Sequence, residues 1–408
     1  MKCKALAIAI TVVTVLHLPV SYGENTYEGI EGILQQITPE LMEEYIQTLQ
    51  DFGPRVTATE ACYEAAQYIY IYSEFEEYGL TVRYYNWSYH SYADVNVEAT
   101  LEGENETSDE IYIVCAHYDS VPGSPGADDD GSGTAAVLAA AKVLSKYRFE
   151  HTIRFLTFSG EEQGLLGSHV YAKECDERGE NIAGVLNADM IGYTRSDEGK
   201  KHIIIEEEDI SSWITDVAIN MSIEYSDEIG LEVVRSPSYP YSDHASFLYY
   251  GYPAVFFFEY DFNDYYHSSE DTIDKMDLDY AARVTRLIVA TLAELAGIKE
   301  GDYELPVVRI EKPHGYLYIG NREIMKLPFD ATIVIGDIDI EVYAVDNQSG
   351  VDRVEFYIDG QLKYVDEKAP YTWTWDERAM LRHFIEVKAY DVAGNENGTS
   401  LAIWIFNS

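Results

Sequence analysis

Two neighbouring stretches of the sequence carry histidine and carboxylate side chains where a divalent metal could bind. The first reads His117-Tyr118-Asp119-Ser120, and a glycine- and proline-rich link joins it to 126–133, Gly-Ala-Asp-Asp-Asp-Gly-Ser-Gly. The apolar, β-branched run 111–116 before them predicts a buried strand. The alanine- and leucine-rich segment 134–146 after them has helical spacing. An imidazole and carboxylates at such a strand-to-helix turn suit a metal with nitrogen and oxygen ligands.

The aspartates at 128–130, taken alone, are typical of a solvated acidic turn. The rest of the chain argues against that interpretation, because the apolar runs 152–158, 184–188 and 253–258 predict strands that alternate with helical segments. This alternation predicts an α/β fold with a mainly parallel, twisted sheet flanked by helices. Ligands bind in the crevice beyond the carboxyl ends of such strands, so we expect the polar groups there to meet. Those groups are Glu161 with Glu162, Asp189, and His267.

Such a set of groups can hold a pair of zinc ions. One carboxylate must bridge the ions, each ion takes further carboxylate and imidazole ligands, and a water or hydroxide lies between them. One more carboxylate must stay off the metals and accept the proton of that water. Glu161 and Glu162 leave a strand, where successive side chains diverge, so one can ligate while the other faces the water.

Five motifs occur in order and with matching spacing, and together they resemble the co-catalytic zinc aminopeptidases of peptidase family M28. The match covers roughly residues 30 to 298 and implies a zinc-exopeptidase-like fold. Each motif is weak alone, but five in register are specific. The motifs are His117-x-Asp119, Gly-Ala-Asp-Asp129-Asp-Gly-Ser-Gly, Gly160-Glu161-Glu162-x-Gly164, Asn-Ala-Asp189-Met and Tyr266-His267.

The resemblance implies two Zn²⁺ ions per chain and a role for each ligand. Asp129 would bridge the ions, with His117 and Asp189 completing one site and Glu162 and His267 the other. The residues leave open which aspartate of 128–130 bridges. The twelve-residue step from His117, and the single aspartate that the family usually has in that place, favour Asp129.

The resemblance also implies three catalytic residues. Glu161 would be the general base and later give its proton to the leaving amine, Asp119 would orient the ring of His117, and Tyr266 would help to hold the oxyanion. His244 lies in a further family-like stretch, 242–246, and we expect it in the wall of the site or behind a ligand. Four aromatic residues are candidates for an apolar side-chain pocket: Tyr239, Tyr241, Phe262 and Tyr265.

The expected function is that of a secreted metallo-aminopeptidase acting on the N-termini of peptides or proteins. A carboxypeptidase, or another peptidase of the same family, is the main alternative, because a two-zinc site does not exclude it. A glutaminyl cyclase, a relative on this fold that uses one zinc, is less favoured because both metal sites are present. A receptor-like relative without activity would need missing ligands, and none is missing.

The sequence pattern changes after Pro306. Short runs of alternating apolar and polar residues, with no helical segments between them, predict a β-sandwich there. Asp359-Gly360 is typical of a two-residue hairpin turn. This region resembles the immunoglobulin-like modules appended to many secreted prokaryotic enzymes. The expected organisation is therefore a signal peptide at 1–23, a zinc peptidase domain at 24–300 and an immunoglobulin-like β-sandwich at 306–408. The module is a candidate for binding a surface, a glycan or a protein partner.

The first 23 residues read as a secretory signal peptide, because a basic start precedes an apolar run, 5–16, that is short for a membrane span. An uncleaved anchor at the cell surface is the alternative. The formal net charge of the whole chain is −44, and removal of the leader, which holds two lysines and no acid, makes it −46. Such a charge argues against nucleic acid or anionic lipid as partners. No other segment is long and apolar enough to cross a membrane.

Three cysteines follow the leader, and their odd number and wide spacing do not form a disulfide framework. Cys115 lies in a predicted buried strand and is expected to be an inert apolar residue. A bridge between Cys62 and Cys175 stays open at this point.

Overall fold

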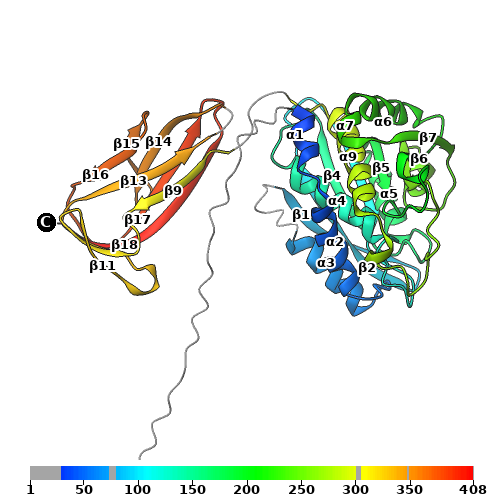
Figure 1. The fold of residues 1–408 in the computed structure, drawn as a ribbon, viewed down its shortest axis with the longest axis horizontal. Helices are drawn as coiled ribbons and strands as arrows, with labels where there is room; N and C mark the ends of the chain where they lie inside the picture. The colour runs from blue at the N-terminus through cyan, green and yellow to red at the C-terminus, as the bar shows by residue number, and fades with distance from the viewer. Residues whose placement is uncertain (1–28, 73–79, 300–304, 347–348, 408) are drawn as a thin grey trace, which may run out of the picture.

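The computed structural model describes residues 29–72, 80–299, 305–346 and 349–407. The expected signal peptide lies outside these residues, as do 300–304 between the two expected domains. The catalytic part is built on one eight-stranded sheet with helices on both faces (Figure 1), in the order β1-β2-β4-β3-β5-β8-β6-β7. Its strands are β1 (Thr81–Tyr89), β2 (Tyr92–Leu101), β3 (Glu110–His117), β4 (Thr152–Phe158), β5 (Asn181–Ala188), β6 (His202–Glu207), β7 (Glu232–Pro237) and β8 (Ala254–Glu259).

The four central strands, β4, β3, β5 and β8, are parallel neighbours. Antiparallel pairings add β2 on one side of them and β6 on the other. The predicted α/β class with a parallel sheet at its centre is confirmed. The helices are α1 (Gly29–Gln35), α2 (Pro39–Asp51), α3 (Glu60–Tyr72), α4 (Gly131–Leu144), α5 (Leu166–Arg178), α6 (Ser212–Glu224), α7 (Ser226–Ile229), α8 (His244–Tyr249) and α9 (Leu278–Leu295).

The position of β3 between two hydrophobic cores explains why residues 111–116 are apolar. Tyr112, Val114 and Ala116 point into the larger hydrophobic core, while Ile113 and Cys115 point into the smaller one. Because successive side chains of a strand face opposite sides of the sheet, a strand covered on both faces needs apolar residues at every position. The strand is thereby fixed at the centre of the fold, and its last residue, His117, opens the site.

Helix α4 begins at Gly131, three residues before the predicted start. The glycines of 126–133 therefore form the first turn of the helix as well as the loop before it. A Cβ atom on Gly133 would lie 2.2 Å from the carbonyl oxygen of Ala188, so only glycine lets α4 approach the end of β5. The buried alanines along α4 maintain this close packing.

Strands β6 and β7 and helix α6 were not predicted. No residue of β7 is buried, so this edge strand lacks the apolar alternation by which a half-buried strand is found. The omission matters, because β6 pairs with β8 and thereby borders the site.

The C-terminal part is a sandwich of a seven-stranded sheet, β11-β10-β12-β18-β17-β14-β15, and a three-stranded sheet, β16-β13-β9. Trp375 is buried in the core between them. Asp359 and Gly360, with φ of 50° and 76°, make the predicted hairpin turn between β14 and β15. The predicted β-sandwich is confirmed. Its strands are β9 (Val307–Lys312), β10 (Tyr316–Ile319), β11 (Arg322–Lys326), β12 (Ile333–Ile335), β13 (Ile338–Val345), β14 (Val351–Ile358), β15 (Gln361–Asp366), β16 (Tyr371–Trp375), β17 (Ala379–Asp391) and β18 (Glu396–Asn407).

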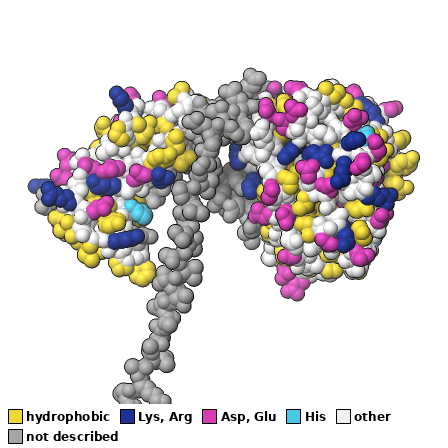
Figure 2. Space-filling model, viewed as in Figure 1, with side chains coloured by type: hydrophobic (Ala, Val, Ile, Leu, Met, Phe, Trp, Pro, Cys, Tyr) yellow, Lys and Arg dark blue, Asp and Glu magenta, His cyan; other side chains and the backbone are white. Residues whose placement is uncertain are grey.

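The three described cysteines are free and buried. Cys62 belongs to the larger core and Cys175 to the smaller one, on opposite faces of the sheet, which excludes the disulfide that the sequence left open. Burial raises the pKa of the Cys115 thiol, as expected of an inert residue. Lysine and arginine side chains are interspersed with acidic ones on the face shown in Figure 2. None of the helices in the described ranges combines the length and the apolar character that a bilayer crossing requires.

Candidate active site

A cavity of about 470 Å³ lies at the carboxyl ends of the central strands and contains the predicted ligands. His117 is the last residue of β3, and Asp189 follows the last residue of β5. Glu161 and Glu162 lie in the turn after β4, and His267 lies in the loop after β8. The polar groups at these strand ends therefore meet in one crevice, as the alternating pattern predicts. The residues that line it are His117, Asp129, Glu161, Glu162, Asp189, Met190, Glu206, Tyr239, Tyr241, Phe256, Phe258, Phe262, Tyr266 and His267.

Asp129 faces both imidazoles. Its Oδ1 lies 3.4 Å from Nε2 of His117, and its Oδ2 lies 3.2 Å from Nε2 of His267. The same nitrogen of His117 is 3.6 Å from Oδ1 of Asp189, and that of His267 is 3.1 Å from Oε2 of Glu162. The five predicted ligands thus form two groups, and the carboxylate of Asp129 is common to both. This is the arrangement that a bridging carboxylate requires.

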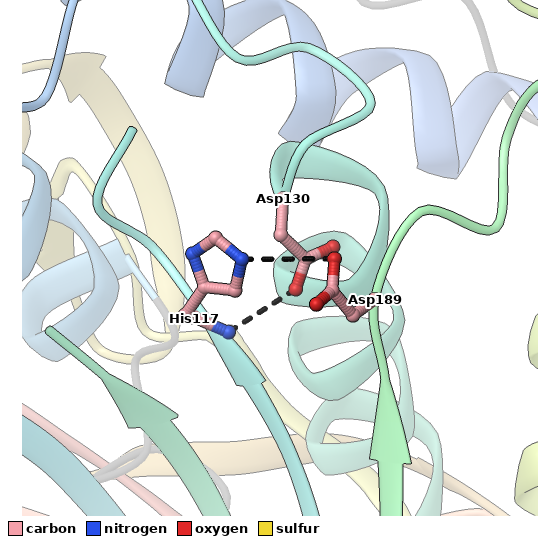
Figure 3. A group of neighbouring side chains, drawn as sticks. All are labelled: His117, Asp130 and Asp189. Carbon is pink, nitrogen blue, oxygen red and sulfur yellow. Dashed lines mark hydrogen bonds and ion pairs between the residues drawn. The ribbon is translucent and has the colours of Figure 1, made fainter. Parts of the chain in front are cut away.

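Asp130 lies beside His117 and Asp189 (Figure 3), but its oxygens are engaged elsewhere. Its Oδ2 accepts a hydrogen bond from the backbone N–H of His117 (3.1 Å), and its Oδ1 accepts from those of Gly133 (2.7 Å) and Met190 (3.3 Å). The carboxylate therefore joins β3, the first turn of α4 and the turn after β5. Its contacts give Asp130 a structural position.

Asp128 is also engaged in the scaffold. It accepts hydrogen bonds from the backbone N–H of Gly192 (2.9 Å) and from the side chain of Asn263 (2.7 Å). Of the three consecutive aspartates, Asp129 is therefore the one that points at both histidines.

The donor set fits metal ions. Oδ1 of Asp189 and Oε1 of Glu162 are buried, and no described protein group donates a hydrogen bond to either. Buried polar atoms normally have a partner, so these two oxygens are available to ligate a cation. Two imidazoles with carboxylates in two groups suit zinc.

The ionisation of these groups indicates the same need for positive charge. Burial, reinforced by Asp129, raises the pKa of Glu162 to about 8. A hydrogen bond to Asp129 raises the pKa of His267, and Glu161 and Asp189 raise that of His117 even though burial opposes it. The carboxylates around both imidazoles therefore favour a positive charge there, which a metal bound to the neutral rings would supply.

The turn after β4 presents Glu161 to the cavity. Gly160 has φ of 78°, and a Cβ atom there would lie 2.8 Å from the ring of Trp87, so glycine permits both the bend and the close packing. Oε2 of Glu161 lies 3.8 Å from Nε2 of His117, farther than the carboxylates of Asp129 and Asp189. Burial raises the pKa of Glu161 well above its ordinary value.

Asp119 is buried behind His117 and beneath the turn that carries the two glutamates. Its carboxylate accepts hydrogen bonds from Thr57 Oγ1 (2.8 Å) and from the backbone N–H groups of Glu161 (3.2 Å) and Glu162 (3.4 Å). Nδ1 of His117 is 3.6 Å from Asp119 Oδ1 and 3.1 Å from the Asp119 carbonyl oxygen. An Nδ1–H that donates to this carbonyl leaves Nε2 free for a metal.

Two supporting residues had no stated role in the sequence-based prediction. Arg55 is fully buried and donates to the carbonyl oxygens of Leu49 (3.0 Å), Tyr118 (2.6 Å), Pro125 (2.5 Å) and Gly126 (2.8 Å). It therefore fixes the loop between His117 and Asp129. The sequence shows only a turn, Phe52-Gly53-Pro54-Arg55, and no local signal that this arginine is buried.

The second supporting residue is Ser242, which donates a hydrogen bond of 2.6 Å to Oδ2 of Asp189. Asn187 in turn donates to Ser242 over 2.7 Å. One oxygen of Asp189 is thus held by the protein, and the other faces His117. Ser242 lies two residues before His244, in the family-like stretch 242–246, and this position could have identified Ser242 as a residue of the site.

The aromatic candidates separate into lining and supporting residues. Tyr266 stacks on His267, with ring centroids 3.7 Å apart and planes at 19°. Burial raises the pKa of Tyr266, so its hydroxyl keeps its proton and can donate. Tyr239, Tyr241 and Phe262 line the cavity as expected. Tyr265 is not among the lining residues and packs against Tyr193.

His244 does not face the ligands. It is buried behind the cavity wall, with its ring stacked on Phe256 at a centroid distance of 5.0 Å and its Nε2 3.0 Å from Oγ of Ser238. Burial lowers the pKa of His244 to about 4. It is a packing residue behind Phe256 rather than, as was expected, a residue of the wall itself or one that contacts a ligand.

Comparisons with known proteins agree with this geometry. Residues 96–292 match the family model "Peptidase family M28", and residues 325–391 match "Bacterial Ig domain". Leucine aminopeptidase 1 of Sclerotinia sclerotiorum is 30% identical over 298 residues, which span 67% of this chain and 75% of the relative.

Solved structures extend the likeness to the fold. The LapA aminopeptidase of Legionella pneumophila aligns with a TM-score of 0.60 and 26% identity over 73% of this chain and 81% of its own. A glutaminyl cyclase of Bacteroides thetaiotaomicron shares the fold at 18% identity, with a TM-score of 0.54 over 63% of this chain and 98% of its own. With two ligand groups that share Asp129 and with these relatives, the chain belongs to peptidase family M28, as a zinc-dependent aminopeptidase followed by a bacterial immunoglobulin-like domain.

Proposed function

We propose that this enzyme removes N-terminal residues from peptides and proteins with a water molecule that two zinc ions activate and Glu161 deprotonates. The observation that carries the proposal is the carboxylate of Asp129, which presents one oxygen to each of two imidazoles. Zinc ions would be held by His117, Asp129, Glu162, Asp189 and His267, and would lower the pKa of a bound water and polarise the scissile carbonyl.

The protein's own groups account for the proton transfers. Glu161 lies in the cavity wall beside both ligand groups and bonds to no metal in this scheme, so it is free to take the proton of the attacking water. Glu161 would hold that proton and then pass it to the leaving amine. Tyr266 lines the same cavity with a protonated hydroxyl and would donate a hydrogen bond to the oxyanion.

The charge of the cavity favours a free amine over a free carboxylate. Of the described residues, those that line it include four carboxylates near the metal groups and no lysine or arginine. A carboxypeptidase must hold the terminal carboxylate of its substrate, and this lining offers no cationic side chain for it. An N-terminal amine, by contrast, gains from the surrounding carboxylates whether it is protonated or bound to a metal.

A glutaminyl cyclase is less well supported. The cyclase of Bacteroides thetaiotaomicron resembles this chain at the level of the fold alone. The second ligand group, Asp129 with Glu162 and His267, is complete here, and a one-zinc enzyme has no need of two groups.

The test is the hydrolysis of matched peptides with free, N-acetylated and C-terminally amidated ends. N-acetylation should lower kcat/KM by about a hundredfold, or about 2.7 kcal/mol, and amidation should change it little. The Glu161→Gln protein, purified in parallel, controls for contaminating peptidases. Cleavage of acetylated peptides from the carboxyl end would show a carboxypeptidase instead, and cyclisation of N-terminal glutamine without hydrolysis would show a cyclase.

We also propose that the mature enzyme is secreted after removal of residues 1–23. The basic start and the short apolar run support this proposal. Expression of the full chain followed by N-terminal sequencing tests it. Protein found in the medium and starting near residue 24 is the expected result, and full-length protein held in the membrane fraction would contradict it.

A further inference from the structure

Glu206 is a charged group in the cavity that the proposed mechanism does not use. It lies on β6, opposite Phe256 of β8, and lines the same cavity as the metal ligands. Apart from Glu161 and the metal ligands, it is the one charged side chain among the described lining residues. Glu206 would therefore contact the part of the substrate that extends into the cavity beyond the metal ligands.

The carboxylate of Glu206 lacks a cationic partner in the described part of the chain. One oxygen accepts a hydrogen bond of 3.0 Å from the backbone N–H of Tyr239. The next residue, Glu207, pairs with Arg235 at 2.8 Å on the outside of the cavity. Glu206 is half-buried, and this partial burial raises its pKa. A cation that enters the cavity would relieve the cost of this burial.

Aromatic rings form the walls around Glu206. The centroids of Phe256 and Phe258 are 5.4 Å apart, those of Phe258 and Phe262 are 6.1 Å apart, and those of Phe262 and Tyr266 are 5.2 Å apart. This row of rings leads from β8 to the tyrosine beside His267 and gives the cavity a long apolar face. Tyr239 and Tyr241, stacked at 5.7 Å, line it as well.

A long side chain with an apolar stem and a cationic end matches these two features. The methylene groups of lysine or arginine bury readily against apolar surface while the charged end keeps a polar partner. Aromatic faces attract the same cations. A purely apolar side chain, such as that of leucine, would fill the aromatic part and leave the Glu206 carboxylate unpaired, which disfavours it.

We propose that the enzyme prefers substrates whose N-terminal residue is lysine or arginine, with Glu206 pairing to the cationic end of that side chain. The inference rests on the proposed aminopeptidase function and specifies its substrate class. It differs from a role of Glu206 in holding the α-amino group, because that group is common to all substrates of an aminopeptidase.

Matched lysine and norleucine substrates with free amines test the proposal, because the two side chains share the same stem and differ in the ammonium group. Wild-type kcat/KM should be about tenfold or more higher for lysine. In Glu206→Gln the lysine-to-norleucine ratio should fall about thirtyfold, or about 2 kcal/mol. The glutamine amide oxygen can still accept the hydrogen bond from Tyr239, so the loop keeps its anchor.

Glu208→Gln is the matched control, since Glu208 is exposed two residues away and the charge change is the same. It should leave the ratio unchanged, which separates local pairing from attraction by the net charge. A wild-type enzyme that cleaves norleucine as well as lysine, or a Glu206→Gln variant that loses both substrates equally, would overturn this inference alone. Failure to cleave any substrate with a free amine would overturn the proposed function and the inference with it.

Discussion

The backbone N–H of Glu161 donates a hydrogen bond of 3.2 Å to Oδ1 of Asp119. That same oxygen lies 3.6 Å from Nδ1 of His117. One buried carboxylate therefore sets the position of the proposed base and contacts a proposed ligand from behind. The relative placement of base and metal depends on this single group.

Replacement of Asp119 tests that dependence. Asp119→Asn should lower kcat about 10- to 100-fold, because an amide cannot accept all the hydrogen bonds that the carboxylate accepts from Thr57, Glu161 and Glu162. KM and zinc content should change less. Thr57→Val is the matched control, since it removes one donor and leaves the carboxylate in place. Equal kcat in Asp119→Asn and wild type would contradict the role.

Asp129 and Asp130 are adjacent carboxylates with different contacts, and asparagine at each should separate their roles. Asp129→Asn should lower the affinity for both zinc ions, because each imidazole faces one of its oxygens. Asp130→Asn should keep the metals but lower the free energy of unfolding by about 1–3 kcal/mol, because one of the two oxygens that accept from backbone N–H groups becomes an NH2 donor.

Metal analysis after gel filtration, together with urea unfolding, distinguishes these outcomes. Wild type should hold about two zinc ions per chain. Chelation should abolish its activity, and added Zn²⁺ should restore it. Metal loss in Asp130→Asn with full occupancy in Asp129→Asn would reverse the assignment.

Glu161→Gln should remove turnover and spare metal binding. The amide has nearly the shape of the carboxylate but cannot accept a proton, and a positioned acid–base group contributes about 10²–10⁴ in rate. Steady-state kinetics and zinc content on the same preparation test this. Near-normal kcat, or a preparation without metal, would show that Glu161 has another role.

His244 should make the metal-free protein sensitive to acid. Its pKa is about 4 in the folded chain, against an ordinary value of 6.5, so the unfolded chain binds the proton first. The stability gained from neutral His244 is present in full above pH 6.5 and is lost as the pH falls toward 4. The loss between pH 7.5 and 4.5 should be about 2–3 kcal/mol.

Urea unfolding in the presence of chelator, followed by far-ultraviolet circular dichroism, measures this effect. His244→Gln should reduce the difference between the two pH values by that amount. His90→Gln, at an exposed position, should leave it unchanged. An identical pH dependence in wild type and His244→Gln would refute the assignment.

Much of the fold could be predicted from the sequence, because the central strands are covered on both faces. The run 152–158 is rich in apolar residues, with Ile153, Phe155, Leu156 and Phe158 buried, and β4 has those bounds. The meeting of the polar groups followed from the strand pattern, since groups at the carboxyl ends of parallel neighbours lie in one crevice, whereas the ligand assignments rested on the family resemblance. The edge strands could not be predicted in this way, because β7 buries no residue and carries no periodic signal.

The parts of the site that escaped prediction depend on contacts between distant segments. Arg55 donates hydrogen bonds to backbone carbonyl oxygens of three separate stretches of chain. Every residue has such a carbonyl, so the sequence does not indicate which ones Arg55 will contact. Glu206 reaches the cavity only because β6 pairs with β8, a pairing that was not predicted. Asp130 is a possible ligand by residue type and position, and only its hydrogen bonds to backbone N–H groups show that its carboxylate supports the scaffold.

The two ligand groups differ in how firmly the fold holds them. His117 and Asp189 lie at the ends of paired central strands, and His117 is 1% exposed. His267 comes from a loop, has φ of 54° and leaves 37% of its side chain exposed. In the proposed centre, the ion held by His117 and Asp189 would therefore exchange with the medium more slowly than the ion held by Glu162 and His267.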